Sequence, residues 1–341
     1  MNRARWIACF FLAVFMEFCT AAFCQMPDLS PLPRTGSLSA PADPAKFTFV
    51  IAGDNRPAHK SCPQPPTPGK IFAAVKSLSP AASFVLWTGD TISGKDPDAK
   101  QIHHEYKEFL DIAKTAGVPV FNAPGNHEMD DSNNDPSDAM KKLYRKYMAQ
   151  TYGAFTYGNS RFIALDSEHE PKPNSSSTDV AAAKIKSKKK DKSDAPGAIT
   201  KKELDLLKKD LDANSSVAHV FIFMHHPVMP YDAQDGLDQA SVDALEKIFA
   251  RHTNISYVVS GHEHLYYNSQ GDKTKVVDPP SRTDPTNPSQ PPYYLVSGGG
   301  GAPLKKNTPG SFFHYLIFSV DGGKVTPTLV KVDSSDPCAK N

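Results

Sequence analysis

The sequence has little excess charge, few cysteines and no apolar run long enough to be an obvious membrane span. Its formal net charge is +1 over 341 residues, which gives no electrostatic attraction for nucleic acid or an anionic membrane, so no nucleic-acid partner is expected. A hydrophobic content of 39% suffices for one large domain or two smaller ones. Thirty prolines and twenty glycines indicate long loops around a compact centre and argue against a helical bundle.

Several familiar site patterns are also missing. The glycine run at residues 298–301 has no Gly-x-Gly-x-x-Gly or Walker pattern around it, which argues against a nucleotide cradle. A tight loop and a loop that shapes a substrate cleft both remain open for it. No His-Glu-x-x-His occurs anywhere in the chain, which excludes the common metalloprotease motif.

Residues 1–24 have the order of an export signal. Two arginines precede a mostly apolar run, residues 6–18, and small residues follow it before Cys24. The run is short for a membrane span and carries Glu17, so no span is expected after signal removal. A permanent anchor and a lipid-anchored Cys24 are the alternatives. The sequence therefore predicts a secreted or periplasmic protein.

The sequence leaves open whether the cysteines of the mature chain form a disulfide. Three of the five cysteines lie in or beside the predicted signal, so the mature chain keeps Cys62 and Cys338 for certain. In an oxidising compartment two such thiols can form a disulfide or stay unpaired. The sequence does not measure the distance between them, and it indicates no oligomeric state.

Composition divides the rest of the chain. Residues 25–45 are rich in Pro and Ser and lack apolar periodicity, so we expect a linker. Residues 46–333 form the expected catalytic domain, and residues 334–341 a C-terminal tail. Within the domain, residues 171–198 are polar, dense in Lys and poor in aromatics, which predicts a disordered surface insertion. The alternative is a basic segment that binds polyanions.

Short apolar runs alternate with stretches of helical periodicity. This alternation is typical of an α/β core with buried strands. The expected strands are residues 47–52, 84–88, 118–123, 162–165, 220–224 and 257–260. The expected helices are residues 71–78, 103–115, 139–148, 201–211 and 241–249. Three more strands are expected near the end, at residues 293–297, 312–320 and 324–332.

Five polar clusters stand where apolar runs end. They are Gly53-Asp54-Asn55-Arg56, Gly89-Asp90, Gly125-Asn126-His127-Glu128, His225-His226-Pro227 and Gly261-His262-Glu263-His264. In α/β sheets, ligands bind at the carboxyl ends of strands, because side chains there converge on a crevice. A leading glycine lets the chain turn tightly, so that the next side chain projects into that crevice. The clusters are therefore expected to meet at one site.

The side-chain types in these clusters suit metal ions. Carboxylate, amide and imidazole groups without thiolates fit hard and borderline divalent cations. Two such ions about 3.5–4 Å apart can clamp the attacking and leaving oxygens of a phosphate, with one carboxylate bridging them. Each cluster alone could be a turn, a helix cap or a buried histidine. Their common order at strand ends favours the metal site.

This succession of clusters resembles the calcineurin-like metallophosphoesterases, especially the purple-acid-phosphatase-like branch. The resemblance spans residues 47–264, and residues 293–304 look like a late strand and loop of secreted members. It implies two mixed β-sheets packed as a sandwich and flanked by helices, a four-layer α/β (α+β) fold. It also implies a centre of two metal ions, with iron, manganese and zinc as the candidates.

The resemblance also implies a role for each matched residue. The implied metal ligands are, in chain order, Asp54, Asp90, Asn126, His225, His262 and His264. Asp54 and His264 would hold the first ion, Asp90 would bridge, and the other three would hold the second. His127 would not ligate; it would orient the phosphate and stabilise or protonate the leaving oxygen. A metal-bound hydroxide would attack phosphorus. His226 has no matching ligand role and is expected to pack in its loop.

Two positions depart from the family patterns. The widespread pattern has a histidine ligand two residues after the first aspartate, where this chain has Arg56. Purple acid phosphatases have a tyrosine ligand three residues after the bridging aspartate, where this chain has Ser93. A guanidinium cannot replace an imidazole as a ligand, but it matches phosphate oxygens with a planar fork. We therefore expect Arg56 to contact the substrate phosphate; the alternative is that it turns away to a surface carboxylate.

The sequence thus predicts a secreted metal-dependent phosphoesterase that hydrolyses phosphomonoesters or phosphodiesters, with a small phosphate ester as its substrate. A second hypothesis is a secreted metal-binding recognition protein that uses the same scaffold without turnover. His127 favours the enzyme, because a purely structural metal site has no use for it. A third is a polyanion-binding protein that works through the Lys-rich insertion, which deletion of the insertion would test.

Overall fold

The predicted strands form two separate mixed sheets in the computed structural model. The structure describes residues 25–95, 98–131, 133–168, 196–283, 292–335 and 338. The predicted signal at residues 1–24 lies outside these residues, and so does the predicted insertion at residues 171–198 except for its last three positions. There Gly197 forms a parallel bridge with Leu237, so these three residues belong to the fold, which corrects this boundary of the insertion.

The first sheet has five strands in the order β11-β10-β1-β2-β3. They are β1 (Lys46–Ala52), β2 (Ala82–Trp87), β3 (Val120–Asn122), β10 (His314–Asp321) and β11 (Lys324–Lys331). β1 lies at the centre, parallel to β2 and antiparallel to β10. The carboxyl ends of β1, β2 and β3 therefore lie at the same edge of this sheet.

The second sheet has six strands in the order β4-β5-β6-β7-β9-β8. They are β4 (Gly153–Tyr157), β5 (Ser160–Ala164), β6 (His219–Phe223), β7 (Ile255–Ser260), β8 (Tyr266–Asn268) and β9 (Tyr293–Ser297). β5, β6, β7 and β9 run parallel to one another, and the edge strands β4 and β8 are antiparallel. The sequence did not predict β4 and β8.

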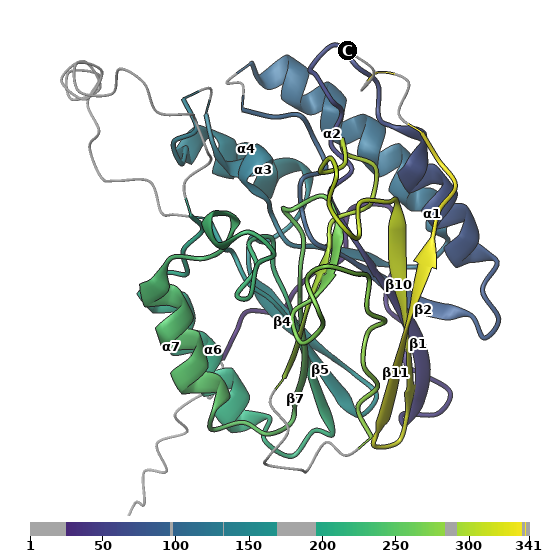
Figure 1. Cartoon of the computed structure of the whole chain (residues 1–341), viewed down its shortest axis with the longest axis vertical. Coiled ribbons are helices and arrows are strands. Elements are labelled where there is room, and N and C mark those ends of the chain that lie inside the picture. Colours follow the sequence, from purple (N-terminus) through teal and green to yellow (C-terminus); the bar gives the residue numbers. More distant parts are fainter. Residues whose placement is uncertain are drawn as a thin grey trace, which may run out of the picture.

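Helices cover the outer faces of both sheets. α1 (Pro66–Lys76), α2 (Ala99–Ala113) and α4 (Asp138–Tyr147) pack on the five-stranded sheet, and α6 (Lys201–Ala213) and α7 (Gln239–Phe249) pack on the other. Figure 1 shows α6 and α7 on the opposite side of the molecule from α1 and α2, with the strands between them. The shorter helices are α3 (Asn126–Met129), η2 (Lys114–Ala116) and η3 (Ala233–Asp235). The predicted four-layer arrangement is confirmed.

The side chains of β1 alternate between the core between the two sheets and the layer of helices. Phe47, Phe49 and Ile51 face the core between the sheets, whereas Val50 and Ala52 face the helices. The ring of Phe49 lies between the sheets, 5.0 Å from that of Phe318 in its own sheet and 4.9 Å from that of Phe221 in the other. Burial on both faces is the reason these strands read as nearly continuous apolar runs.

The segment at residues 25–45 is not a free linker, which corrects the expectation from its composition. The side chains of Met26, Leu29 and Leu32 are 1–5% exposed. Leu29 N–H donates to the carbonyl of Ala154 in β4, and Leu32 N–H donates to that of Val120 in β3. The segment therefore covers one edge strand of each sheet, which satisfies backbone groups that an open edge would expose.

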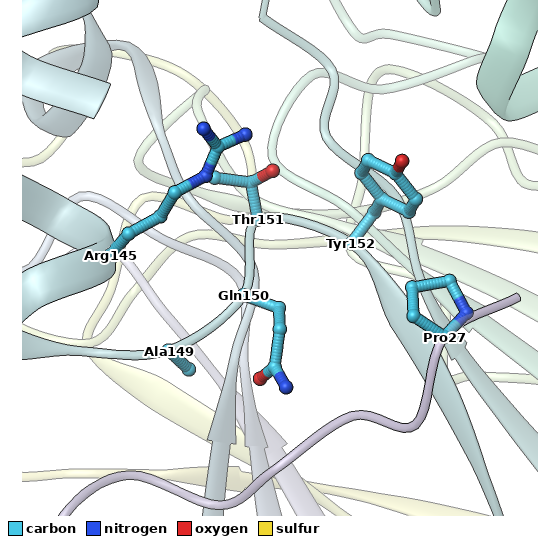
Figure 2. Close-up of a pocket in the computed structure, with 6 residues that line it drawn as sticks. All are labelled: Pro27, Arg145, Ala149, Gln150, Thr151 and Tyr152. Carbon is cyan, nitrogen blue, oxygen red and sulfur yellow. The ribbon is translucent and has the colours of Figure 1, made fainter. Parts of the chain in front are cut away.

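A cavity of about 510 Å³ lies along this seam, lined by Pro27, Arg145, Ala149, Gln150, Thr151 and Tyr152. Figure 2 shows Arg145 reaching from α4, with Tyr152 beside Pro27 on the other side. Gln150 Nε2 donates to the carbonyl of Asp28, so a lining residue also holds the N-terminal segment in place. None of the predicted site residues lines this cavity.

A disulfide joins Cys62 to Cys338, which answers the question that the sequence left open. The C-terminal segment also docks on α1, where Lys70 donates to the carbonyl of Asp333. The loop that follows Arg56 is therefore tied to the end of the chain. Within the described residues, no helix has the length and apolar character needed to cross a bilayer.

Candidate metal centre

The five predicted clusters meet at one place, between the adjoining edges of the two sheets. Three of them follow β1, β2 and β3 of the five-stranded sheet, and two follow β6 and β7 of the six-stranded sheet. His225 Nε2 lies 3.4 Å from Asp90 Oδ1, so side chains from different sheets are in direct contact. The structure brings together every residue that the sequence assigned to the site.

One group of potential ligands consists of Asp54, Asp90 and His264. One ligand atom from each of these side chains lies within 4.8 Å of the other two. His264 Nε2 is 3.8 Å from Asp54 Oδ1. Asp54 Oδ2 is buried and has no hydrogen-bond partner among the described residues. A buried carboxylate oxygen without a partner is costly unless a cation compensates for it, so this group fits a metal ion.

A second group surrounds His225 Nε2. Asn126 Oδ1 and His262 Nδ1 each lie 3.1 Å from this nitrogen. Asp90 Oδ1 is also close to it, so Asp90 contacts both groups. The three kinds of ligand atom in this group are imidazole nitrogen, amide oxygen and carboxylate oxygen, which suit borderline metal ions.

Backbone carbonyls determine which ring nitrogens carry hydrogen. His225 Nδ1 lies 2.8 Å from the carbonyl oxygen of Thr88, and His264 Nδ1 lies 2.8 Å from that of Pro303. A carbonyl oxygen only accepts, so in both residues Nδ1 donates and Nε2 turns a lone pair toward the centre. This pattern is the usual support of a metal-ligating histidine.

The charges also favour bound cations. Burial and the neighbouring charge of Asp90 raise the pKa of Asp54 well above its ordinary value. Burial alone would raise the pKa of Asp90 too, but His225, His127 and Arg56 hold it below its ordinary value. Two buried carboxyl groups this close cannot both stay ionised without positive charge between them. Burial likewise lowers the pKa of His262 and lowers that of His264 to about 4, which keeps both rings neutral and able to ligate.

The backbone at the site adopts an uncommon conformation. The φ angles of Asp54, Asp90, His262 and His264 are +62°, +51°, +71° and +46°, a region that residues other than glycine seldom occupy. Such strain clusters at functional sites. Gly261 allows the backbone after β7 to pack tightly against Asp54, because a Cβ at this position would lie 2.1 Å from Asp54 Oδ2. The glycine run 298–301 forms a tight loop behind this strand end, and Gly300 N–H donates to the carbonyl of Gly53.

Arg56 and His127 lie on the open side of the centre. Arg56 Nε is 3.5 Å from Asp90 Oδ2, and His127 Nε2 is 4.0 Å from the same oxygen. The alternative in which Arg56 turns away to a surface carboxylate therefore does not hold. His127 Nδ1 donates to the carbonyl oxygen of Ser93 at 2.6 Å, so Ser93 orients His127 through its backbone. Burial, followed by the charge of Arg56, lowers the pKa of His127 to about 3.

The sequence interpretation gave no role to Glu128, although this residue organises the loop that carries Asp90. Its carboxylate accepts hydrogen bonds from the backbone N–H groups of Gly125, Asp90 and Thr91, at 2.7, 3.0 and 2.5 Å. Glu128 is fully buried, so these bonds fix the approach of α3 to β2. A glutamate at the third position of a short helix is the signal that could have identified it.

Two further residues outside the predicted set support the histidines. The carboxylate of Glu263 points away from its neighbours His262 and His264 and accepts from the N–H groups of Tyr231 and Asp232, both at 2.7 Å. The ring of His226 lies against that of His262, with centroids 4.3 Å apart, and its Nδ1 is 3.0 Å from Glu168 Oε1. His226 thus packs behind a predicted ligand.

Comparison with known proteins gives a family and a fold. The family model described as calcineurin-like phosphoesterase matches residues 47–266. A curated relative, the 3',5'-cyclic adenosine monophosphate phosphodiesterase CpdA of Haemophilus influenzae, is 24% identical over 220 residues. The match covers 62% of this chain and 65% of the relative, so it spans less than two thirds of that protein.

Solved structures share the architecture at low identity. A dimetal phosphatase of Danio rerio is similar with a TM-score of 0.57 and 15% identity, over 86% of this chain and 100% of that chain. Purple acid phosphatase PPD1 from yellow lupin has a TM-score of 0.53 and 15% identity, over 87% and 54%. GAP50 of Plasmodium, described as the anchor in the inner membrane complex, has a TM-score of 0.52 and 12% identity, over 86% and 87%.

Proposed function

Because the chain belongs to the calcineurin-like phosphoesterase family, whose model matches residues 47–266, we propose that it is a metal-dependent hydrolase of phosphomonoesters or phosphodiesters. The observation that carries this proposal is the position of Asp90. Its two oxygens lie between two groups of potential ligands, and Arg56 and His127 face the same carboxylate from the open side. A purely structural metal site needs neither of these two groups.

The residues of the centre would divide into holding and reacting groups. Asp54, Asp90 and His264 would hold one ion, and Asp90 would share the second with Asn126, His225 and His262. When bound, the two ions would lower the pKa of a coordinated water and neutralise charge on the phosphoryl group. Iron, manganese and zinc all accept this combination of oxygen and nitrogen ligands.

The chain's own side chains would then act on the substrate from the open side. The guanidinium of Arg56 would bind phosphate oxygens with two parallel hydrogen bonds, which orients the ester bond. His127 Nε2 faces the same space, because its Nδ1 is held by the carbonyl of Ser93. The negative charge of a bound phosphate would raise the pKa of this ring. Nε2 would then carry a proton, with which it would stabilise the leaving oxygen or protonate it, so that the alcohol leaves neutral.

We propose further that the protein works outside the cytoplasm. The export-like order of residues 1–24 and the disulfide between Cys62 and Cys338 support this location, because disulfides persist in oxidising compartments. Within the centre, the absence of thiolate ligands makes the site compatible with such a compartment.

The deciding experiment is a panel of phosphomonoesters and phosphodiesters assayed with the purified protein after chelation and reloading with iron, manganese or zinc. We expect chelation to abolish hydrolysis and at least one of the metals to restore it. The competing function is metal-dependent recognition without turnover on the same scaffold. Full metal loading with no hydrolysis of any ester in the panel would contradict the enzyme and favour recognition.

Arg56→Ala tests the phosphate-binding role directly. We expect the inhibition constant of inorganic phosphate and the KM of the substrate each to rise by roughly 10–100-fold, the usual effect of losing a hydrogen bond from a charged group. The more tightly bound metal should be retained, because Arg56 is no ligand. Arg56→His should instead strengthen the first metal site by supplying a ligand. Metal titration and phosphate inhibition measure the two effects.

The control for this experiment is Arg145→Ala, which removes an arginine that lines the cavity of Figure 2 and does not line the cleft of the predicted ligands. This control should leave phosphate inhibition within about twofold of the wild type, as is usual for surface changes. If Arg56→Ala leaves phosphate inhibition unchanged and Arg56→His leaves metal affinity unchanged, Arg56 has neither role.

A further inference from the structure

The open side of the centre leads into a cleft of about 250 Å³. Predicted site residues make up most of its lining, and Glu263 together with three residues here called the rim completes it. The rim residues are Asp235 of η3 and, from the loop after β9, Pro303 and Lys305. The leaving group of a phosphate ester bound at the centre would lie along this rim, so the chemistry of the rim residues bears on substrate choice.

The cleft is small and polar. Apart from histidine, none of its lining residues is aromatic, and Pro303 is its one apolar member. Pockets for drug-sized ligands measure roughly 300–1,000 Å³ and are lined mostly by apolar and aromatic side chains. This cleft therefore lies below that range, and apart from its histidines it offers no aromatic ring on which a nucleobase could stack.

The charges at the rim are held in fixed positions. Lys305 Nζ lies 2.9 Å from Asp235 Oδ2 and 3.7 Å from Glu263 Oε1, and it is also paired with Asp232. Burial opposes the charge, but the hydrogen bonds that Lys305 donates to Asp232 and Asp235 raise the pKa of Lys305 above its ordinary value. Lys305 and Asp235 thus place a hydrogen-bond donor and an acceptor side by side in the lining of the cleft.

Both rim elements are tied to the predicted ligands. Pro303 supplies the carbonyl that orients His264, and Lys305 N–H donates to the carbonyl of His264 at 3.3 Å. On the other side, Glu263 accepts from the backbone of Tyr231 and Asp232, which leads into η3 and Asp235. The donor and acceptor are therefore positioned relative to the centre by its own loops.

We propose that Asp235 and Lys305 form a subsite for hydroxyl groups on the leaving alcohol, so that the preferred substrates are phosphomonoesters of small polyols. A hydroxyl group both donates and accepts, and it can therefore bond to the carboxylate of Asp235 and the ammonium of Lys305 together. The inference rests on the proposed function. In that hydrolysis a water oxygen bonds to phosphorus, the ester P–O bond breaks, and the alcohol oxygen takes a proton, with net consumption of one water.

The test compares glycerol 3-phosphate with propyl phosphate, which has the same carbon chain without the two hydroxyl groups. For the wild-type protein we expect kcat/KM to be about tenfold higher for the glycerol ester, mainly through KM, since a site built for hydroxyl groups rejects an analogue that lacks them. Asp235→Asn and Lys305→Met should each reduce this ratio to within about twofold of unity.

The matched control is Asp205→Asn. Asp205 also pairs with a lysine, Lys201 of α6, but does not line the cleft, so the ratio should stay near the wild-type value. Equal rates for both esters in the wild type, preference for 3',5'-cyclic AMP, or the same loss in Asp205→Asn as in Asp235→Asn would overturn the subsite. Failure of the proposed function is a different result, in which the metal-loaded protein hydrolyses none of these esters.

Discussion

Asp90→Ala is expected to lose both metal ions together and to lower kcat by roughly 10³-fold or more. Asp90 contacts both ligand groups, through His225 Nε2 at 3.4 Å and through its position beside Asp54 and His264. A metal ion contributes several kcal/mol to transition-state stabilisation, and each 1.36 kcal/mol corresponds to about tenfold in rate. Metal analysis of the purified variant, together with steady-state kinetics, checks both parts.

The neighbouring ligands provide the controls for Asp90. His264→Ala removes a side chain from the first group alone, and Asn126→Ala removes one from the second alone. Each should weaken one ion and spare the other. If Asp90→Ala retains one ion at full occupancy, the bridging role is wrong even if the activity falls.

His127→Gln is expected to keep wild-type metal content while kcat falls by roughly 10²–10⁴-fold, the usual worth of a positioned acid or base. His127 meets the centre only through Asp90, with Nε2 at 4.0 Å, so its loss removes no ligand. The decrease should be smaller for esters of acidic alcohols, because a good leaving group needs little protonation. Rates for a series of leaving groups measure this dependence.

Two outcomes distinguish the roles open to His127. A loss that is equal for all leaving groups would assign it to positioning of the phosphate and not to the leaving oxygen. Loss of metal from the variant would show that it supports the ligands structurally. Ser93 orients His127 through its carbonyl, whereas its hydroxyl donates to Glu105 at 3.5 Å. Replacement of Ser93 by Ala should therefore leave the dependence on leaving group unchanged.

The sequence was sufficient to predict the centre because its ligands follow buried strands directly. Asp54, Asp90, His225 and His262 each come a few residues after the end of a strand, and the ends of parallel strands share one edge. The order of the strands in the two sheets could not be predicted in the same way, because it depends on long-range pairing such as that of β1 with β10.

Residues that act through the backbone were harder to predict. Glu128 and Glu263 hold their loops by accepting from N–H groups, and every residue except proline offers such a group, so their partners leave no trace in the sequence. The same reason explains the N-terminal segment. Its few apolar residues have no helical or strand periodicity, yet they pack because the backbone of the segment pairs with β3 and β4.

One missed element did have a local signal. β4 and β5 form a hairpin around Gly158-Asn159, and Gly158 has a φ of +57°. A two-residue loop of this composition between β-branched and aromatic residues is typical of a hairpin. Only the second strand was predicted, from its apolar run at residues 162–165; the first, residues 153–157, contains Gly and Thr and has no such run.

The place of β1 in its sheet affects the order in which the protein is assembled during synthesis. β1 lies between β2, which leaves the ribosome soon after it, and β10, which leaves long after both. Until β10 arrives, one edge of β1 has unpaired backbone groups and is open to the wrong partner. A nascent chain that stops before His314 already contains the last predicted ligand, His264, but it lacks the strand that completes the support of Asp54. All the predicted ligands are therefore synthesised before the sheet that supports Asp54 can be completed.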